Sequence, residues 1–187
     1  MLEPTMLKAP GTVERHTTQS PEETMALGAL LGQRLGPGSV VAFFGELGSG
    51  KTTMIKGIAR GLGVTETVRS PSFVIATHYT GQRQGKQVKV THVDLYRLPS
   101  RETCPRIASQ DLTAKTEPGN SAKVESGQFS ELDNLGLRDI LAEDSITLIE
   151  WADRATELLP RTAVKIRLQA GPGHVRHIEV AWPHDGT

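Results

Sequence analysis

Hydrophobic residues along the chain alternate between short continuous runs and helical spacing, which is the pattern of an α/β protein. Residues 39–44 and 146–149 are apolar runs of the length expected for buried parallel strands. Helical spacing follows the first run through Met54–Leu62, and Gly63 is positioned to end that helix. A further helix is predicted over 20–35, because it opens with a Ser-Pro-Glu-Glu capping box.

Further short strands are predicted at 12–17, at 73–79 with 87–93, and at 164–168 with 176–182. The first should be an edge strand, and the second pair should form a hairpin with an extended loop across 80–86. The last pair alternates around Gly-Pro-Gly and should be an antiparallel hairpin with one solvated face. The predicted fold is a mostly parallel central sheet flanked by helices, with antiparallel strands added at the edge and at the C-terminal end.

Residues 99–130 differ in composition, because they are rich in Ser, Thr and charge and poor in apolar residues. A segment of this kind inside a compact domain is either disordered or a functional lid. The apolar positions within 132–141 then suggest a helix opened by Ser130. We expect a flexible tail over 1–10 and a single domain over 11–187 that carries this insertion.

Charge and cysteine content narrow the class of protein. The 187 residues hold 21 basic and 21 acidic side chains. A protein that binds nucleic acid by itself usually has a basic excess, so any role on nucleic acid should pass through a partner. Cys104 is the single cysteine, which excludes an internal disulfide and a thiolate metal cluster. No apolar run reaches the length of a membrane span and no signal-peptide core opens the chain, so we expect a soluble cytoplasmic protein.

Residues 45–52 read Gly-Glu-Leu-Gly-Ser-Gly-Lys-Thr, an unbroken match to the phosphate-binding loop pattern G-x-x-x-x-G-K-[ST]. The glycines let backbone N–H groups point at the phosphates of a nucleotide, Lys51 would reach the β- and γ-phosphates, and the Thr52 hydroxyl would hold Mg²⁺. A predicted strand precedes the loop and a predicted helix follows it, and the helix N-terminus adds partial positive charge. The sequence therefore predicts that the chain binds a nucleoside triphosphate.

Two carboxylates, Asp94 and Glu150, follow predicted strands and could hold the metal or orient water, as strand-end acids do beside phosphate loops. Either could instead be a surface carboxylate. The run before Glu150 is the more continuously apolar, so its strand should be the more central. Ser70-Pro71-Ser72 could be a loop that senses the γ-phosphate or an ordinary turn.

The remaining candidates carry weaker signals. Trp151 could be a core or lid residue, or it could contact the nucleotide. The six histidines lack metal-site spacing, which predicts that each is solvated or hydrogen-bonded.

Four strings together resemble the TsaE family, the ATPase subunit of the bacterial machinery that forms N6-threonylcarbamoyladenosine in tRNA. They are residues 45–53, Ser-Pro-Ser-Phe at 70–73, His-Val-Asp-Leu-Tyr-Arg-Leu at 92–98, and Leu-Ile-Glu-Trp-Ala-Asp-Arg at 148–154. The phosphate loop is common to many NTPases, whereas the last two strings are far more specific. The resemblance spans about residues 12–170 apart from the polar segment at 99–130, which in the family is usually a much shorter link.

The resemblance implies a P-loop NTPase fold that uses ATP and Mg²⁺. It implies catalytic roles for Lys51, Asp94 and Glu150, with Asp94 on the Mg²⁺ side and Glu150 near the γ-phosphate. The metal would be held by Thr52, Asp94 and Glu150. The expected nucleotide contacts are Glu46, Leu47, Gly48, Ser49, Gly50, Lys51, Thr52, Thr53, Ser70, Ser72 and Trp151. Ser72 departs from the family, which usually has Thr there, but the hydroxyl is retained.

By the same resemblance, hydrolysis would drive or reset a tRNA-modifying complex with TsaB-like and TsaD-like subunits, and tRNA would be met only through that complex. No arginine finger or water-orienting glutamine is evident, which predicts slow turnover alone and stimulation by partners. One rival is a P-loop small-molecule kinase whose lid, within 99–130, would use Arg101, Arg106, Lys115 and Lys123. A second rival is a nucleotide-gated binding module without useful catalysis.

Overall fold

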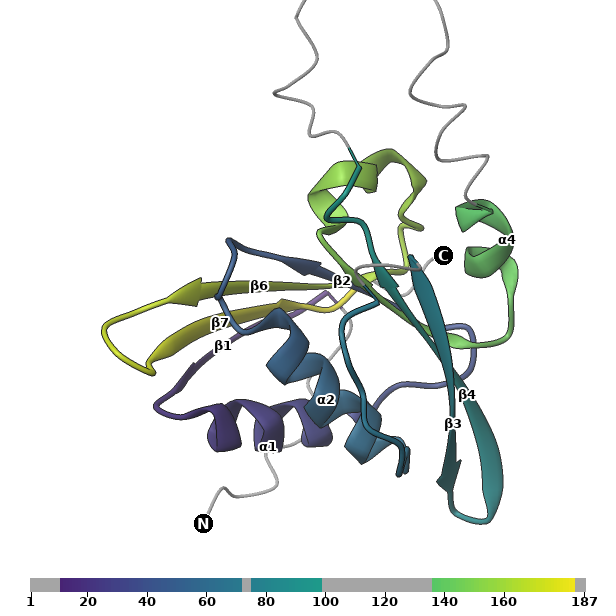
Figure 1. Ribbon diagram of the computed structural model, residues 1–187, viewed down its shortest axis with the longest axis horizontal. Helices are drawn as coiled ribbons and strands as arrows, with labels where there is room; N and C mark the ends of the chain where they lie inside the picture. Colours follow the sequence, from purple (N-terminus) through teal and green to yellow (C-terminus); the bar gives the residue numbers. More distant parts are fainter. Residues whose placement is uncertain (1–10, 72–74, 99–135, 184–187) are drawn as a thin grey trace, which may run out of the picture.

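The computed structural model describes residues 11–71, 75–98 and 136–183. Within these ranges the chain forms one seven-stranded mixed sheet with helices on both faces (Figure 1). The predicted tail at 1–10, the predicted insertion at 99–130 with its four cations, and the helix start at Ser130 lie outside the described residues.

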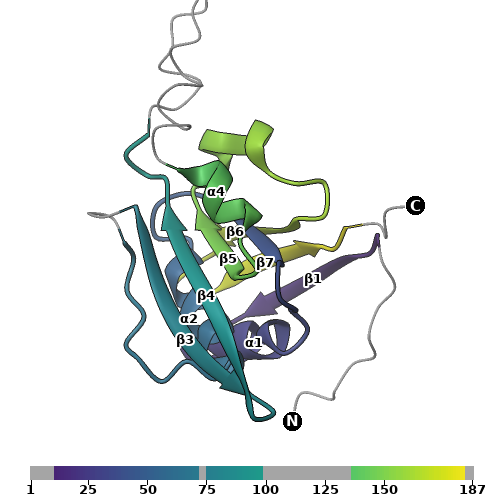
Figure 2. The same ribbon diagram turned by 90° about the vertical axis from the view of Figure 1, so that its right-hand side faces the viewer.

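Four parallel strands form the centre of the sheet. In spatial order they are β6 (Val164–Ala170), β2 (Val40–Phe44), β5 (Ile146–Glu150) and β4 (Lys86–Asp94). Antiparallel strands extend both sides: β7 (Arg176–Ala181) and then β1 (Val13–Thr18) beyond β6, and β3 (Ala76–Arg83) beyond β4. Figure 2 shows these two antiparallel parts on opposite sides of the molecule. The expected mixed sheet is confirmed, and the strand that ends on Glu150 is the more central of the two acid-bearing strands.

The β3–β4 connection differs from the sequence prediction of an extended loop across 80–86. The two strands are joined by a two-residue turn, Gln84 and Gly85, which both adopt positive φ of 52° and 74°. Gly81 lies within β3 itself, and a Cβ there would lie 2.3 Å from the Leu62 carbonyl oxygen. This glycine marks a close approach of two backbones and not a turn, which is why the prediction was wrong.

Helices α1 (Pro21–Gly32) and α2 (Lys51–Gly61) cover one face of the sheet, and α4 (Leu137–Ala142) and the 3-10 helix η1 (Ala152–Leu158) cover the other. The predicted N-cap of α1 is confirmed, since the Ser20 hydroxyl accepts the Glu23 N–H at 3.1 Å. None of the helices in the described ranges is long and apolar enough to cross a membrane.

The two helices beneath the sheet cross at their glycines. A Cβ at Gly28 of α1 would lie 2.5 Å from the Met54 carbonyl oxygen, and one at Gly57 of α2 would lie 2.2 Å from the Met25 carbonyl oxygen. The backbones therefore approach more closely than any side chain would allow. This contact fixes α2, and with it the loop that precedes α2, against the rest of the domain.

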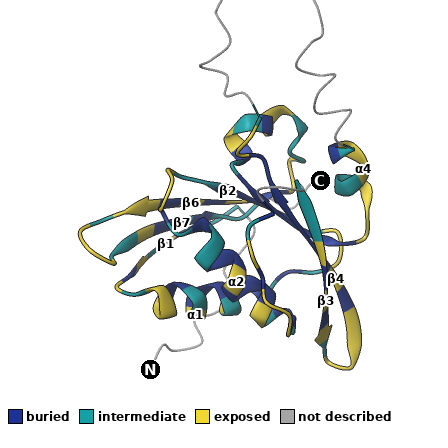
Figure 3. Ribbon diagram, viewed as in Figure 1, coloured by how far each residue is buried: buried dark blue, intermediate teal, exposed yellow. Residues whose placement is uncertain are grey.

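The pleat of the central strands decides which side chains face the glycine loop. Val90 and Leu148 pack in the core beneath the sheet, with α1 and α2, whereas Val93 and Ile149 pack in the core above it. Figure 3 shows these central strands as the most buried part of the molecule. Because alternate residues share a face, the residues at 92, 94 and 150 lie on the α2 side, at or near the carboxyl ends of adjacent strands.

Candidate functional site

The glycine loop runs from β2 to α2 and takes a conformation that requires its glycines. Gly45, Gly48 and Gly50 have φ of 140°, 75° and 102°, a region that residues with a Cβ avoid. Helix α2 then begins at Lys51 with no side chain capping its first N–H groups. Those N–H groups, together with the helix dipole, make the start of α2 suited to an anion.

Lys51 is held over the loop by two backbone carbonyls. Its Nζ donates to the carbonyl oxygens of Gly45 at 2.7 Å and Glu46 at 2.9 Å, and it lies 3.8 Å from the centre of the Trp151 ring. Burial lowers the pKa of Lys51 below its ordinary value, and nearby carboxylates, Glu150 first, only partly offset that effect. The ammonium is therefore a partly desolvated cation that would gain from an anion at the loop.

The Glu150 carboxylate at the end of β5 joins the loop to β4. The Thr52 hydroxyl donates to its two oxygens at 2.8 and 3.0 Å, and His92 Nε2 lies 3.0 Å from Oε1. Glu150 is 3% exposed and His92 is 0% exposed. The expectation that the histidines are hydrogen-bonded or solvated covers His92, but it gave no hint that His92 contacts a site carboxylate. The available signal was its position two residues before Asp94, hence on the same strand face.

Asp94 ends β4 directly beside Glu150, since the two are register partners. Its carboxylate accepts a hydrogen bond from the Ser70 hydroxyl, and its Oδ1 accepts the Tyr96 N–H at 2.9 Å. Ser70 therefore lies against the carboxylates, while Ser72 lies outside the described residues.

Trp151 lies between the loop and the segment after β4. Its φ is 58°, which is strained for a bulky side chain, and its ring packs against Tyr96 with the centroids 5.0 Å apart. The Arg154 guanidinium lies 5.6 Å from the Trp151 ring and donates to the Leu98 carbonyl oxygen. Trp151 therefore contacts Lys51 of the glycine loop. This contact is compatible with both sequence interpretations, a core or lid residue and a neighbour of the nucleotide.

These groups line one cavity of about 650 Å³. Its sequence-predicted lining residues are Leu47, Gly48, Gly50, Lys51, Thr52, Thr53, Ser70, Asp94, Glu150 and Trp151. Glu46 contributes its carbonyl to Lys51 instead, and Ser49 is buried with its hydroxyl lacking a hydrogen-bond partner within the described part of the chain.

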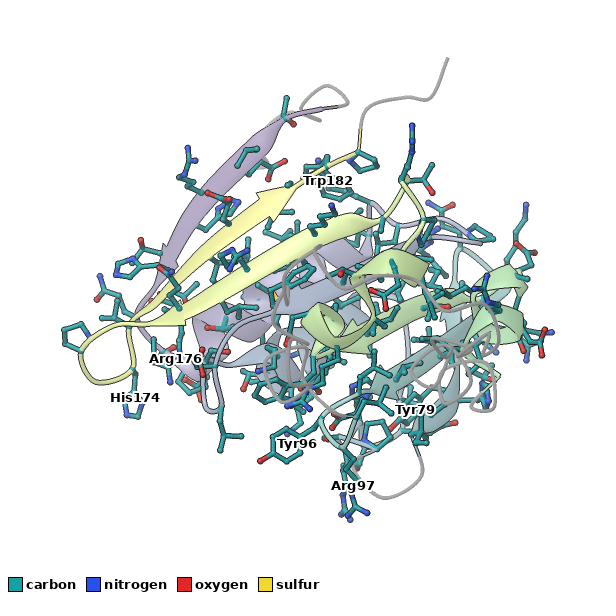
Figure 4. The ribbon with its side chains drawn as sticks, turned by 90° about the horizontal axis from the view of Figure 1, so that it is seen from above. Tyr79, Tyr96, Arg97, His174, Arg176 and Trp182 are labelled. Carbon is teal, nitrogen blue, oxygen red and sulfur yellow. The ribbon has the colours of Figure 1, made fainter. Side chains whose placement is uncertain are left out.

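Six further residues line the cavity that sequence reasoning did not select: Pro21, Thr24, Tyr96, Arg97, His174 and Arg176. Figure 4 shows His174 and Arg176 on one side, from the β6–β7 hairpin, and Tyr96 and Arg97 on another, after β4. Arg176 Nη2 donates to the Gly48 carbonyl at 3.2 Å. Tyr96 and Arg97 could have been found through their place in the 92–98 string. The other four come from distant segments and carried no local signal.

No group of three or more His, Cys, Asp or Glu that could hold a metal occurs within the described ranges. The cavity instead offers two carboxylates and a hydroxyl from Asp94, Glu150 and Thr52. Such hard oxygen donors suit Mg²⁺, which commonly takes one or two protein carboxylates and completes its shell with phosphate oxygens and water. The donor set therefore fits a magnesium ion shared with a nucleotide.

The fold and the cavity define a mixed α/β protein in which a glycine loop, an uncapped helix N-terminus and two strand-end carboxylates meet. The chain belongs to the TsaE family, because the family model described as "Threonylcarbamoyl adenosine biosynthesis protein TsaE" matches residues 18–178. The resemblance inferred from the four strings is thus confirmed.

Individual relatives agree with the family match. The "tRNA threonylcarbamoyladenosine biosynthesis protein TsaE" of Mycobacterium tuberculosis is 36% identical over 148 residues, which cover 79% of this chain and 74% of that protein. The protein of the same name from Treponema pallidum is 30% identical over 167 residues, which cover 89% of this chain and 99% of that protein. The crystal structure of Bacillus subtilis YdiB superposes with a TM-score of 0.60 at 26% identity, covering 91% of this chain and 86% of that one.

Proposed function

We propose that this chain is a P-loop NTPase that binds ATP with Mg²⁺ and hydrolyses it to ADP and phosphate. The observation that carries the proposal is the convergence of Lys51, Thr52 and Glu150 in one cavity, with the Thr52 hydroxyl 2.8 Å from the Glu150 carboxylate. They supply a phosphate-binding cation, a hydroxyl suited to Mg²⁺ and an acid, at the start of an uncapped helix.

The triphosphate would lie along residues 45–53, where backbone N–H groups and the α2 N-terminus face it. Lys51 would exchange the carbonyl oxygens of Gly45 and Glu46 for phosphate oxygens. Its lowered pKa supports this exchange, since a partly desolvated ammonium regains electrostatic stabilisation beside phosphate. The remaining cavity wall, from α1 and the β6–β7 hairpin, would surround the rest of the nucleotide.

The two carboxylates would have different roles. Thr52 and Glu150 are hydrogen-bonded to each other, which supports Glu150 as the acid on the Mg²⁺ side. Asp94 bonds Ser70, which supports a role in ordering the serine segment and the metal's surroundings. The sequence expectation that Asp94 lies on the Mg²⁺ side is the alternative assignment and stays a prediction. Mg²⁺ would neutralise charge that develops on the phosphates during transfer to water.

Turnover by the isolated chain should be slow. Arg176 reaches the loop, but its guanidinium donates to the carbonyl oxygens of Gly48, Gly173 and Val175. These contacts with backbone oxygens support a low rate for the chain alone. We therefore infer that partners complete the site, as partner-supplied groups do for other NTPases.

The family name supports a role for this hydrolysis in forming N6-threonylcarbamoyladenosine in tRNA. We propose that the partners of the chain are TsaB-like and TsaD-like subunits and that the complex acts in the cytoplasm. The balanced charge of the chain supports contact with tRNA only through the complex.

The test is Mg²⁺-dependent ATP hydrolysis by the full chain, alone and with a TsaB–TsaD pair and tRNA. We expect ADP and free phosphate in equal amounts, a low rate alone and stimulation by the pair. Brisk hydrolysis that the pair leaves unchanged would contradict the partner-dependent part of the proposal. ADP release that requires an added acceptor and yields no free phosphate would instead identify a kinase.

A nucleotide-gated binding module is the second candidate, and one contact favours it. Lys51 lies against Trp151, which packs on Tyr96, and Tyr96 is 47% exposed. Movement of Lys51 toward phosphate would change the packing of Trp151 and, through it, the position of the exposed Tyr96 ring. If Glu150→Gln abolished hydrolysis but ATP still promoted partner binding and tRNA modification, gating would be the working function.

A further inference from the structure

We propose that His92 is the positioning residue of Glu150, to which its Nε2–H donates a hydrogen bond. In this arrangement the Nε2–H donates to Glu150 Oε1 and turns the carboxylate toward the Thr52 hydroxyl. The inference rests on the proposed ATPase function, because it assigns a residue to the acid of that site.

The sheet brings the two side chains together. Strands β4 and β5 are parallel neighbours, with His92 paired to Leu148 and Asp94 paired to Glu150. His92 and Glu150 share the α2 side of the pleat, so the imidazole lies one step deeper along the strands than the carboxylate. The histidine is 0% exposed, so it cannot touch the nucleotide cavity directly and acts through Glu150.

Hydrogen-bond accounting assigns the proton. The carboxylate is an acceptor, so the ring nitrogen 3.0 Å from it must be the donor. The other nitrogen, Nδ1, is buried and has no hydrogen-bond partner among the described residues. The alternative tautomer, with its proton on Nδ1 only, would leave a buried N–H without an acceptor and place the Nε2 lone pair against the carboxylate. Both effects would raise the free energy of the folded state.

The consequence for the site is orientation. Thr52 and His92 are the side chains that hydrogen-bond the Glu150 carboxylate within the described part of the chain. The Thr52 hydroxyl is also the group that would turn to Mg²⁺, so only the bond from His92 would persist through a catalytic cycle. Loss of such a supporting donor typically lowers activity about 10–100-fold.

Two substitutions at one position separate orientation from packing. Leu in His92→Leu is apolar and cannot donate, whereas Gln in His92→Gln can place an amide N–H near the position of Nε2. We expect His92→Leu to lower the kcat for ATP by about 10–100-fold, with a KM for ATP within about threefold of the parent, since Lys51 and the loop still hold the phosphates. His92→Gln should recover most of that loss. The matched control is His78→Leu, because His78 is exposed on the neighbouring strand and lies outside the cavity lining.

The proton position is measured independently on the parent protein. Long-range proton–nitrogen NMR of the ¹⁵N-labelled full chain, with His92 assigned through its backbone resonances, should show a proton on His92 Nε2. A His92 Nε2 without a proton would overturn the inference even if neither variant folds. Equal kcat for the parent and His92→Leu would overturn it while leaving the ATPase proposal intact. If the parent, with or without partners, hydrolyses no ATP, the proposed function fails and the positioning role fails with it.

Discussion

Within the described part of the chain, two buried carboxylates each contact a histidine, and they lie in opposite parts of the sheet. Glu150 in the parallel centre is 3% exposed with His92 3.0 Å away, and Glu14 in the antiparallel part is 8% exposed with His16 3.3 Å away. The difference is the third partner. Glu14 also bonds the guanidinium of Arg34 at 2.9 Å, whereas Glu150 receives the neutral hydroxyl of Thr52.

In the described ranges, the presence or absence of a bonded arginine distinguishes a carboxylate with a structural role, Glu14, from one that can still bind a cation, Glu150. A buried anion is stable when a fixed cation compensates it. Arg34 is fixed in that role, because it also lies 3.8 Å from the Trp182 ring. Among the described residues, the side chains that hydrogen-bond the Glu150 carboxylate are Thr52 and His92, while the nearby Lys51 ammonium is held by the backbone carbonyls of Gly45 and Glu46 and not by the carboxylate. The site thus retains a capacity for a cation that the antiparallel part has already filled.

Removing the ammonium group of Lys51 should have the largest effect on the site. We expect Lys51→Ala to weaken ATP binding at least about 100-fold, which corresponds to roughly 3 kcal/mol. Because burial lowers the pKa of Lys51, its loss should not reduce the unfolding temperature appreciably. Calorimetric titration with ATP and thermal unfolding check both expectations. Lys56→Ala is the control, since Lys56 is exposed on the same helix; unchanged ATP affinity in Lys51→Ala would contradict the assignment of the loop.

Neutralising the Glu150 carboxylate should have the second largest effect. Glu150→Gln should lower hydrolysis about 100-fold or more, as loss of a group that acts on the reacting water or metal does. ATP binding should persist and the free energy of unfolding should change by less than about 1 kcal/mol, because among the described residues no arginine is paired with this carboxylate and the amide oxygen still accepts hydrogen bonds. Steady-state kinetics and denaturant unfolding measure the two quantities. A large loss of stability with normal hydrolysis would reverse the comparison between Glu150 and Glu14.

The matching change at Glu14 should do the opposite. Glu14→Gln should destabilise the fold by about 1–3 kcal/mol, the range for a charge-assisted hydrogen bond, and leave ATP affinity unchanged. Burial alone would raise the pKa of Glu14, but its contacts with Arg34 and His16 outweigh burial and the pKa is lowered. A lowered carboxyl pKa stabilises the folded state above the ordinary value and loses that effect as pH falls through the lowered value. Urea unfolding of both proteins at neutral and acid pH should therefore show a difference at neutral pH that disappears in acid.

The smallest effect is expected for an exposed ion pair on the same antiparallel strands. Arg15 and Glu179 are 3.0 Å apart, with side chains 77% and 41% exposed. Arg15→Ala should change the free energy of unfolding by no more than about 1 kcal/mol, because water and salt screen such pairs. A loss of stability as large as that of Glu14→Gln would show that burial does not explain the difference between the Arg15–Glu179 and Arg34–Glu14 pairs.

The sequence predicted most of the elements that build the site, for physical reasons that are local. The continuous apolar run at 39–44 and the glycine loop after it act through neighbouring residues, and so does the Ser20 cap of α1. The prediction of the β3–β4 connection was wrong because Gly81 allows a close contact with the distant Leu62 carbonyl and does not form a turn. His92 was missed as a site residue for a similar reason, since its partner is 58 residues away.

By itself, therefore, the sequence determined the mixed sheet, the loop and the family, because each depends on residue order and short-range chemistry. Only the tertiary structure decided which groups meet. It set Thr52 against Glu150 and not Asp94, and it brought Arg176 from the last hairpin to Gly48. It also gave one buried carboxylate a fixed arginine and the other a hydroxyl and an imidazole, since strand register and pleat fix distances between residues that no local pattern connects.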